Sequence, residues 1–359
     1  VLPSGLSCPP ALQQRHLWAE GRRMATVDVT VMGAGIFGLS VAYTCARRGA
    51  KVRVIDPNGV ASGASGGLVG ALAPHVPENW NAKKAFQFES LIMAEAFWFG
   101  IKDLTGQDVG YVRSGRLQPL ADERAVGLAR ERAVSAVALW EGKAVWKVVP
   151  VGDANWRPPS PTTLVVHDTL PALIHPRRAT QALANAVVAL GGEIAAKGPE
   201  EGKVVWATGW PGMKEIGGNG VKGQAALLHH DAAGQPQLFA DALHIIPHSD
   251  GTVAVGSTSE RDFDDPVSTD EALNDVLKRA IAAVPALAGA EVIARWAGVR
   301  PRSKSRAPVL GSHPARKGQF IANGGFKIGF GMAPKVGAVM ADLVLDDKDT
   351  VPDGFRSLV

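Results

Sequence analysis

The hydrophobic pattern after Met24 predicts a strand, a glycine-rich turn, a helix and a second strand in succession. Residues 27–32 form a β-branched, alternating run, and residues 36–48 carry apolar side chains in a helical pattern that stops at Gly49. A short apolar run follows over residues 52–55. Strand, helix and strand in this order form a βαβ unit, which requires a parallel sheet. The first part of the chain is therefore predicted to be an α/β domain.

Farther along the chain, helical and extended patterns alternate, which indicates a second structural layer. The predicted elements are a helix over residues 82–103, an extended run over 109–120, a helix over 176–191, a strand over 203–207, strands within 224–257, a helix over 271–284 and a last helix that begins near Pro334. Pro334 is expected at the first helical position. A dinucleotide-binding domain built from three separated segments, with two insertions between them, accounts for this alternation.

Composition and charge exclude several classes of protein. The chain has 359 residues, 46% of them hydrophobic, which is enough for two or three domains with apolar cores. Its 38 Lys and Arg against 34 Asp and Glu leave a charge of +4, spread along the chain, so we expect no nucleic-acid partner. No stretch of about 18 uncharged apolar residues is present to span a membrane. Cys8 and Cys45 form neither a disulfide framework nor a metal site, which favours a reducing, cytoplasmic compartment.

Residues 1–23 are kept apart from the fold prediction. They contain prolines, Arg15 in the middle and no continuous apolar stretch, so they lack the order of a secretory signal. We expect an extension ahead of a natural start at Met24, either disordered or introduced by cloning. A transit-like or partner-binding segment is the alternative.

A G-x-G-x-x-G motif stands directly after the first predicted strand. It consists of Gly33, Gly35 and Gly38, and Asp56 lies at the end of the next strand. Gly33 permits the tight turn, Gly35 lets the backbone approach a pyrophosphate, and Gly38 allows close packing of the helix. Asp56 would accept hydrogen bonds from ribose hydroxyls, and the phosphates would lie at the helix N-terminus. The motif predicts a dinucleotide site but does not distinguish a nicotinamide from a flavin.

A second loop of small residues, 61–75, follows the second strand. It contains Gly63-Ala64-Ser65-Gly66-Gly67, which formally matches the G-x-S-x-G nucleophile elbow of hydrolases. An elbow requires a strand directly before the serine and a helix after it, whereas the predicted strand ends at Ile55 and glycines follow. We therefore predict a loop that lies against a flat or phosphorylated ligand. A flexible surface loop is the alternative.

Four segments taken together resemble the D-amino-acid oxidase family of flavoenzymes. They are the glycine motif, the small-residue loop, the strand that ends Trp206-Ala207-Thr208-Gly209, and the later Trp296-Ala297-Gly298-Val299-Arg300-Pro301. They occur in the order that the family uses, between Met24 and about Leu345, and the pattern is nearest to glycine oxidase and sarcosine oxidase.

The resemblance implies a fold and a domain division. The expected class is α/β, with a Rossmann-like FAD-binding domain (GR2-type) and an inserted α+β substrate domain on an antiparallel sheet. The expected FAD-binding segments are 24–80, 170–222 and 295–359, and the expected substrate-domain segments are 81–169 and 223–294.

The resemblance also implies the cofactor, FAD, and the oxidation of a primary or secondary amine. Covalent sarcosine-type members carry a C-terminal cysteine for flavin attachment, and no cysteine follows Cys45, so we expect noncovalent FAD. A single dinucleotide fingerprint argues against a reductase that holds both FAD and a nicotinamide. The expected partners are a small amine or amino-acid substrate and either O2 or an electron-acceptor protein. An oligomer is left open.

The expected cofactor contacts come from all the motif segments. They are Gly33, Gly35, Ile36, Phe37, Gly38, Asp56, Pro57, Ser62, Ala64, Ser65, Gly66, Gly67, Leu68, Thr208, Gly209, Gly325, Phe326, Lys327, Ile328 and Gly329. The segment 324–334 resembles the element that brings the family's last helix to the flavin ring. The positive end of that helix would stabilise negative charge on the ring.

Two cations, Arg300 and Lys327, are the candidate catalytic residues. Arg300 lies in a G-x-R-P element whose arginine clamps the substrate carboxylate in similar oxidases, and a guanidinium matches a carboxylate with two hydrogen bonds. A solvated surface arginine is the alternative, and Arg302 is the reserve candidate. Lys327 stands near the position where glycine oxidase relatives have an arginine, so handling of substrate or oxygen and a merely solvated lysine both stay open.

The implied reaction is hydride transfer from the substrate α-carbon to flavin N5, after which the imine is hydrolysed to an oxo acid and ammonia or an amine. Neither Tyr43 nor Tyr111 lies in the later insertion, where D-amino-acid oxidases place tyrosines over the substrate, so a glycine or sarcosine type is favoured over D-amino-acid oxidase itself. The alternatives are a flavin-holding subunit or tRNA-modifying relative that acts with a macromolecular partner, and a nicotinamide dehydrogenase.

The remaining histidines are expected to be structural or surface residues, and the tryptophans to be structural. His75, His244, His248 and His313 lack metal-ligand spacing, and two of them, His75 and His248, keep the alternative of facing the substrate. Trp80, Trp98 and Trp296 are expected to pack in cores rather than stack on the flavin.

Overall fold

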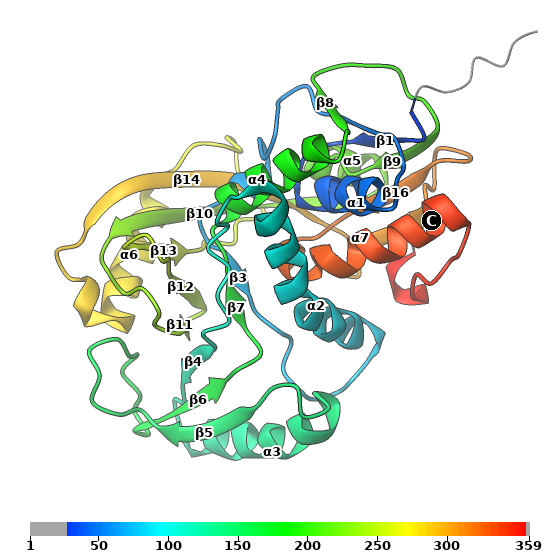
Figure 1. Cartoon of the computed structure of the whole chain (residues 1–359). Coiled ribbons are helices and arrows are strands. Elements are labelled where there is room, and N and C mark those ends of the chain that lie inside the picture. The colour runs from blue at the N-terminus through cyan, green and yellow to red at the C-terminus, as the bar shows by residue number, and fades with distance from the viewer. Residues whose placement is uncertain (1–26, 357–359) are drawn as a thin grey trace, which may run out of the picture.

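A computed structural model describes residues 27–356, so the expected extension 1–23 lies outside the described residues. One of its sheets is six-stranded and largely parallel (Figure 1). The strand order is β15 (Val309–Ser312), β16 (Phe320–Asn323), β9 (Lys203–Trp206), β1 (Val29–Met32), β2 (Val52–Ile55) and β8 (Glu193–Ala195). All neighbours pair in parallel except β15 and β16. The ends of β1, β2 and β9 therefore meet at one edge of the sheet, where ligands bind in open α/β folds.

Four helices pack together beside this sheet. They are α1 (Ile36–Arg47), α2 (Ala82–Thr105), α4 (Pro176–Ala189) and α7 (Gly329–Asp346), and both α1 and α2 contact α4 and α7 (Figure 1). A Cβ at Gly337 would lie 2.7 Å from the carbonyl oxygen of Ser40, so glycine is what lets α7 cross α1 this closely. The segment 81–169, expected in the substrate domain, thus contributes its first helix to the helical layer of the parallel sheet.

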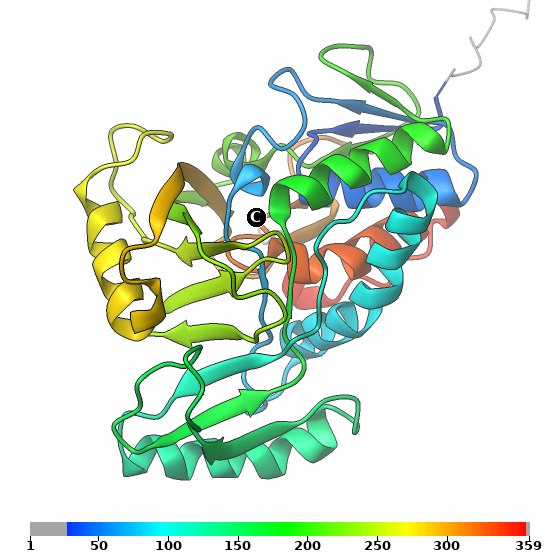
Figure 2. The ribbon, with the colours of Figure 1, turned by 60° about the vertical axis from the view of Figure 1, so that its left-hand side comes forward.

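The second sheet has eight strands and is antiparallel except where β11 meets β4. Its order is β14 (Glu291–Arg302), β10 (Asn219–His229), β13 (Thr252–Gly256), β12 (Leu243–Pro247), β11 (Gln237–Ala240), β4 (Arg116–Pro119), β6 (Leu164–Asp168) and β5 (Trp146–Pro150). Helix α6 (Glu271–Ala283) packs on β10 and β13, and α3 (Glu123–Leu139) packs on β5. Figure 2 shows α3 at the end of the molecule away from α1 and α7.

The long strands β10 and β14 connect the two layers. They pair over their whole length, and α5 (Gly209–Glu215) contacts both of them as well as β16 of the parallel sheet. The expected domain boundaries at 222/223 and 294/295 fall inside these two strands. A two-stranded sheet of β3 (Ala71–Leu72) and β7 (Ala172–Leu173) and the short helices η1 (Ala64–Gly66), η2 (Pro285–Leu287) and η3 (Asp353–Phe355) complete the fold.

Two local expectations need correction. Pro334 is not the first residue of its helix, because α7 begins at Gly329 and contains Pro334 in its interior. Most of the run 109–120 is irregular, with an isolated bridge from Val112 to Leu173 and one regular strand, β4. Within residues 27–356, no helix combines the length and apolar character needed to cross a bilayer, and no group of His, Cys, Asp and Glu side chains has a metal-binding arrangement.

Candidate active site

The glycine turn after β1 is held too tightly for side chains. Gly33 has φ +113°, and a Cβ there would lie 2.8 Å from the carbonyl carbon of Ala207 at the end of β9. A Cβ at Gly38 would overlap the carbonyl oxygen of Gly33. These two glycines therefore bring α1 against the ends of β1 and β9, as the motif predicts.

The N-terminus of α1 has no negatively charged side chain in its first turn. Gly35 occupies the capping position without a side-chain hydrogen bond. The backbone N–H of Ile36 donates to Ser65 Oγ over 2.9 Å, so a hydroxyl of the second loop lies at the positive end of the helix. Asp56 accepts from the N–H groups of Ala34 and Asn58 at 2.8 and 3.0 Å, which fixes its carboxylate beside the turn.

The second small-residue loop is a packed structure between the two sheets. A Cβ at Gly66 would overlap the carbonyl oxygen of Ala61, and Arg177 Nε donates to the carbonyl oxygen of Gly66 over 2.8 Å. Gly67 lies against the Trp296 ring, 3.3 Å from the position of its missing Cβ to Cη2. These contacts pack the loop against the rest of the fold, so it is not a free surface loop. It is not a nucleophile elbow either, because only the three-residue helix η1 follows Gly63. Within the loop Leu68 is buried, whereas Ser62 is exposed.

Two later segments complete this edge of the parallel sheet. Thr208 caps α5 without a side-chain hydrogen bond, and Gly209 has φ +63° and accepts from Asn323 Nδ2 over 2.9 Å. The segment 325–329 packs on the start of α1: a Cβ at Gly325 would lie 3.0 Å from Phe37 Cζ, and one at Gly329 would lie 3.4 Å from Ile36 Cγ2.

The predicted cofactor residues therefore come together from four distant parts of the chain. Residues 33–38 and 56 meet residues 64–68, 208–209 and 325–329 around the start of α1. Pro57 is exposed just beyond Asp56.

Arg300 lies in β14 and is 8% exposed. Its Nη2 donates to Ser257 Oγ, and Nη1 donates to the carbonyl oxygen of Thr258 over 3.3 Å. A Cβ at Gly223 would overlap the guanidinium, so the side chain lies flat across β10 where glycine leaves room. Burial lowers the pKa of Arg300 to about 10, against the opposing attraction of Glu260. The alternative of a solvated surface arginine is therefore wrong for Arg300.

Lys327 lies within electrostatic range of Arg300 and of His244. Burial, followed by repulsion from Arg300, holds the pKa of Lys327 below its ordinary value. Burial lowers the pKa of His244 to about 3, with smaller contributions from Arg116 and Lys327, so its imidazole is neutral. His244 Nδ1 is buried and has no hydrogen-bond partner within the described residues. The sequence pattern predicted no functional role for His244. The hydrophobic pattern of β12 shows which residues share a face of the strand, but it does not show which residues from elsewhere in the chain pack against that face.

The other predicted residues have the following neighbours. Arg302, the reserve candidate, lies 5.9 Å from the Phe326 ring centroid and lines a separate surface cavity of about 400 Å³ with Trp210 and Phe263. His248 Nε2 contacts the carbonyl oxygen of Leu68 at 3.4 Å. His75 contacts Gln87 of α2, and His313 accepts from the Ala315 N–H. Trp98 is fully buried in the core, whereas Trp80 packs at its margin.

Comparison with known proteins decides the family. A family model described as FAD dependent oxidoreductase (DAO) matches residues 28–343. The chain belongs to the DAO family. Glycine oxidase of Geobacillus kaustophilus (strain HTA426) is 27% identical over 91% of the chain and 94% of that protein.

Solved structures of the DAO type share the fold. The crystal structure of glycine oxidase from Geobacillus kaustophilus has a TM-score of 0.79 at 22% identity and covers 92% of this chain and 98% of that one. Iminodiacetate oxidase from Chelativorans sp. BNC1 has a TM-score of 0.81 at 21% identity, with the same coverage. These structures confirm the expected α/β class, and the family match confirms FAD dependence and the oxidoreductase class.

The residues of this DAO-family chain fit FAD on structural grounds. The N-terminus of α1, where Ser65 Oγ accepts from the Ile36 N–H, Gly35 without a side chain, and the fixed carboxylate of Asp56 supply a positive helix end, space and an acceptor for a dinucleotide. The individual contacts assigned to the cofactor stay predictions.

Proposed function

We propose that this oxidoreductase acts on a small amino acid or a secondary amine that carries a carboxylate. The observation that carries the proposal is Arg300, which is buried and forms no ion pair with any carboxylate of residues 27–356. A buried cation is costly unless an anion comes to it, and a guanidinium binds a carboxylate with two hydrogen bonds. The relatives named glycine oxidase support a small substrate.

The protein's part is to bind and orient this substrate. Arg300 holds the carboxylate, and Lys327, which lies beside the Phe326 ring and within electrostatic range of Arg300, is the second cation. When bound, FAD supplies a hydride acceptor, N5, so oxidation of the substrate α-carbon gives an imine that water hydrolyses to an oxo acid and ammonia or an amine. Because positioning does most of the work, no dedicated acid or base is required.

Noncovalent attachment of FAD is part of the proposal. Cys45 is the cysteine of residues 27–356, and it is buried within α1. Burial raises the pKa of its thiol to about 12, so the reactive thiolate is absent at neutral pH. We expect acid precipitation to release all of the flavin into solution.

The test is an anaerobic titration of the FAD-loaded protein with glycine, sarcosine, proline, iminodiacetate and a panel of D-amino acids. The expected result is loss of the oxidised-flavin absorbance with at least one of them, and admission of air then shows whether O2 restores it. If the whole panel leaves the flavin oxidised, the proposed substrate class is wrong.

The substitution Arg300→Ala tests the carboxylate clamp. Loss of a charge-assisted pair of hydrogen bonds is expected to raise KM by about 10- to 100-fold while the flavin spectrum stays intact. Arg295→Ala is the matched control, because Arg295 lies on the same strand but is exposed and bonds Asn274. Equal kinetics in both variants would assign the clamp to another residue.

A further inference from the structure

The segment that contacts Arg300 is an additional strand-like strap, residues 257–260, alongside the first half of β10. Lys222 and Glu260 exchange backbone hydrogen bonds of 2.9 and 3.0 Å, and Thr258 N–H donates to the carbonyl oxygen of Gln224 over 3.2 Å. Because side chains alternate along paired strands, Lys222, Gln224, Thr258 and Glu260 lie on one face. The other face carries Gly223, across which the guanidinium of Arg300 extends.

The guanidinium face of the strap offers Arg300 only neutral oxygens. They are the hydroxyl of Ser257 and the carbonyl of Thr258. Glu260 is the carboxylate whose attraction acts on Arg300, yet it forms no ion pair with it. Arg300 therefore keeps both charge and donors for an incoming anion.

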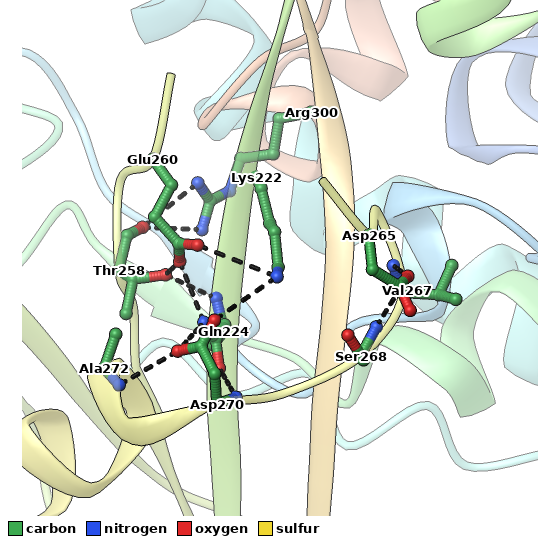
Figure 3. A network of polar contacts seen from close by, with 10 residues as sticks. All are labelled: Lys222, Gln224, Thr258, Glu260, Asp265, Val267, Ser268, Asp270, Ala272 and Arg300. Carbon is green, nitrogen blue, oxygen red and sulfur yellow. Dashed lines mark hydrogen bonds and ion pairs between the residues drawn. The ribbon is translucent and has the colours of Figure 1, made fainter. Parts of the chain in front are cut away.

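The opposite face holds that carboxylate in a network around Lys222 (Figure 3). Lys222 is 3% exposed, and its Nζ lies 3.7 Å from Glu260 Oε2 and 3.6 Å from Asp270 Oδ2. Gln224 Nε2 donates to Glu260 Oε1 and Asp270 Oδ1 over 3.1 and 2.8 Å, and its Oε1 accepts from the Asp270 N–H. The Thr258 hydroxyl also bonds Glu260. One buried ammonium thus holds two carboxylates that would otherwise repel each other.

We propose that Lys222 is a positioning residue that keeps Glu260 on the far face of the strap, so that Arg300 stays free to bind the substrate carboxylate. The proposal rests on the proposed function, in which Arg300 is the carboxylate clamp. Without the ammonium, Glu260 and Asp270 face each other unneutralised, and Arg300 is the buried cation next to the same strap. Glu260 then competes with the substrate for the guanidinium.

The experiment measures binding of acetate, a carboxylate without an amine to oxidise, to the FAD-loaded protein. Its dissociation constant is read from the change in the visible flavin spectrum at constant ionic strength, with chloride as the reference anion. Lys222→Met is expected to weaken acetate binding and to raise substrate KM by about tenfold or more, with kcat changed far less. Arg132→Met, which breaks a distant bidentate pair with Glu78, is the matched control and leaves acetate binding unchanged.

The double variant Lys222→Met/Glu260→Gln separates charge competition from simple loss of structure. It removes the competing anion while an amide keeps the hydrogen bonds of the strap, so acetate binding returns to within about threefold of the original. If the double variant binds acetate as weakly as Lys222→Met, or if Lys222→Met binds it normally, the proposal is wrong.

A third variant keeps the test decisive if Lys222→Met does not fold. Glu260→Gln alone is expected to bind acetate as well as or better than the unmodified protein, and tenfold weaker binding overturns the proposal. Failure of the proposed function looks different, because the unmodified protein itself would then neither bind acetate nor oxidise any carboxylated amine.

Discussion

At the scale of single residues, the site depends on glycines at positions where a side chain would overlap a neighbouring group. Gly223 leaves the space in which the Arg300 guanidinium lies, and Gly33 and Gly38 leave the space in which α1 approaches the parallel sheet. The motif spacing predicts the second pair, because dinucleotide turns require them. No motif predicts Gly223, whose requirement arises from a side chain 77 positions later that pairing of β10 with β14 brings across it.

The second cation of the site leads to a prediction about pH. Lys327 has a pKa below its ordinary value, because burial and the Arg300 charge both disfavour its protonated form. The charged form binds a carboxylate, so acetate affinity is expected to be highest below the lowered pKa of Lys327 and to fall as pH rises through it. Titration of acetate binding at a series of pH values measures this.

Two variants identify the group that titrates. Lys327→Met is expected to bind acetate several-fold more weakly at neutral pH and to lose the first alkaline decline. Lys327→Arg keeps its charge and moves the decline to higher pH. A decline of the same size and position in Lys327→Met would assign it to Arg300, whose pKa is about 10.

At the scale of elements, hydrophobic periodicity predicted those helices and strands that have a regular apolar face and clear end signals. The strand 52–55 and the helix 271–284 correspond to β2 and α6, which have a clear apolar period and clear stops. Helix α3 was not predicted, since its outward side chains include Val134 and Val137 at 77% and 73% exposure, which blur the apolar face. The parallel pairing of β11 with β4 joins segments more than a hundred residues apart, and no local pattern specifies it.

The unpredicted helix α3 provides a test of backbone conformation. Gly127 lies inside it, and a Cβ there would meet no atom within 4 Å. Gly127→Ala is therefore expected to raise the free energy of unfolding by about 0.5–1 kcal/mol, as measured by urea denaturation. Gly142→Ala is the contrasting variant: its surroundings are equally open, but φ is +69°, so the change is expected to destabilise. Equal effects of the two would mean that conformation does not decide them.

At the scale of the whole molecule, the predicted cofactor site joins parts of the chain that are distant in sequence. Its walls come from β1 and α1, from the loop after β2, from the end of β9 and from the start of α7. Sequence motifs predicted each of these segments as cofactor-binding, and the sheet order and the crossing of α1 by α7 bring the segments together. A ligand bound there contacts four segments at once, so its binding free energy adds to the stability of the folded chain.

Thermal unfolding with and without FAD tests that linkage. A ligand at 100 times its dissociation constant stabilises a protein by about 2.7 kcal/mol, so excess FAD is expected to raise Tm by several degrees. Gly35→Ala is expected to abolish this rise. Its Cβ would lie 3.2 Å from the Ser65 hydroxyl, a contact that a small rotation relieves, so the protein still folds, but the methyl occupies the approach of a phosphate to α1. Gly354→Ala, in open space within η3, is the control and retains the rise. If Gly35→Ala keeps the full FAD-dependent rise, the pyrophosphate does not lie at the start of α1, and the arrangement of the four walls around it must serve a different part of the ligand.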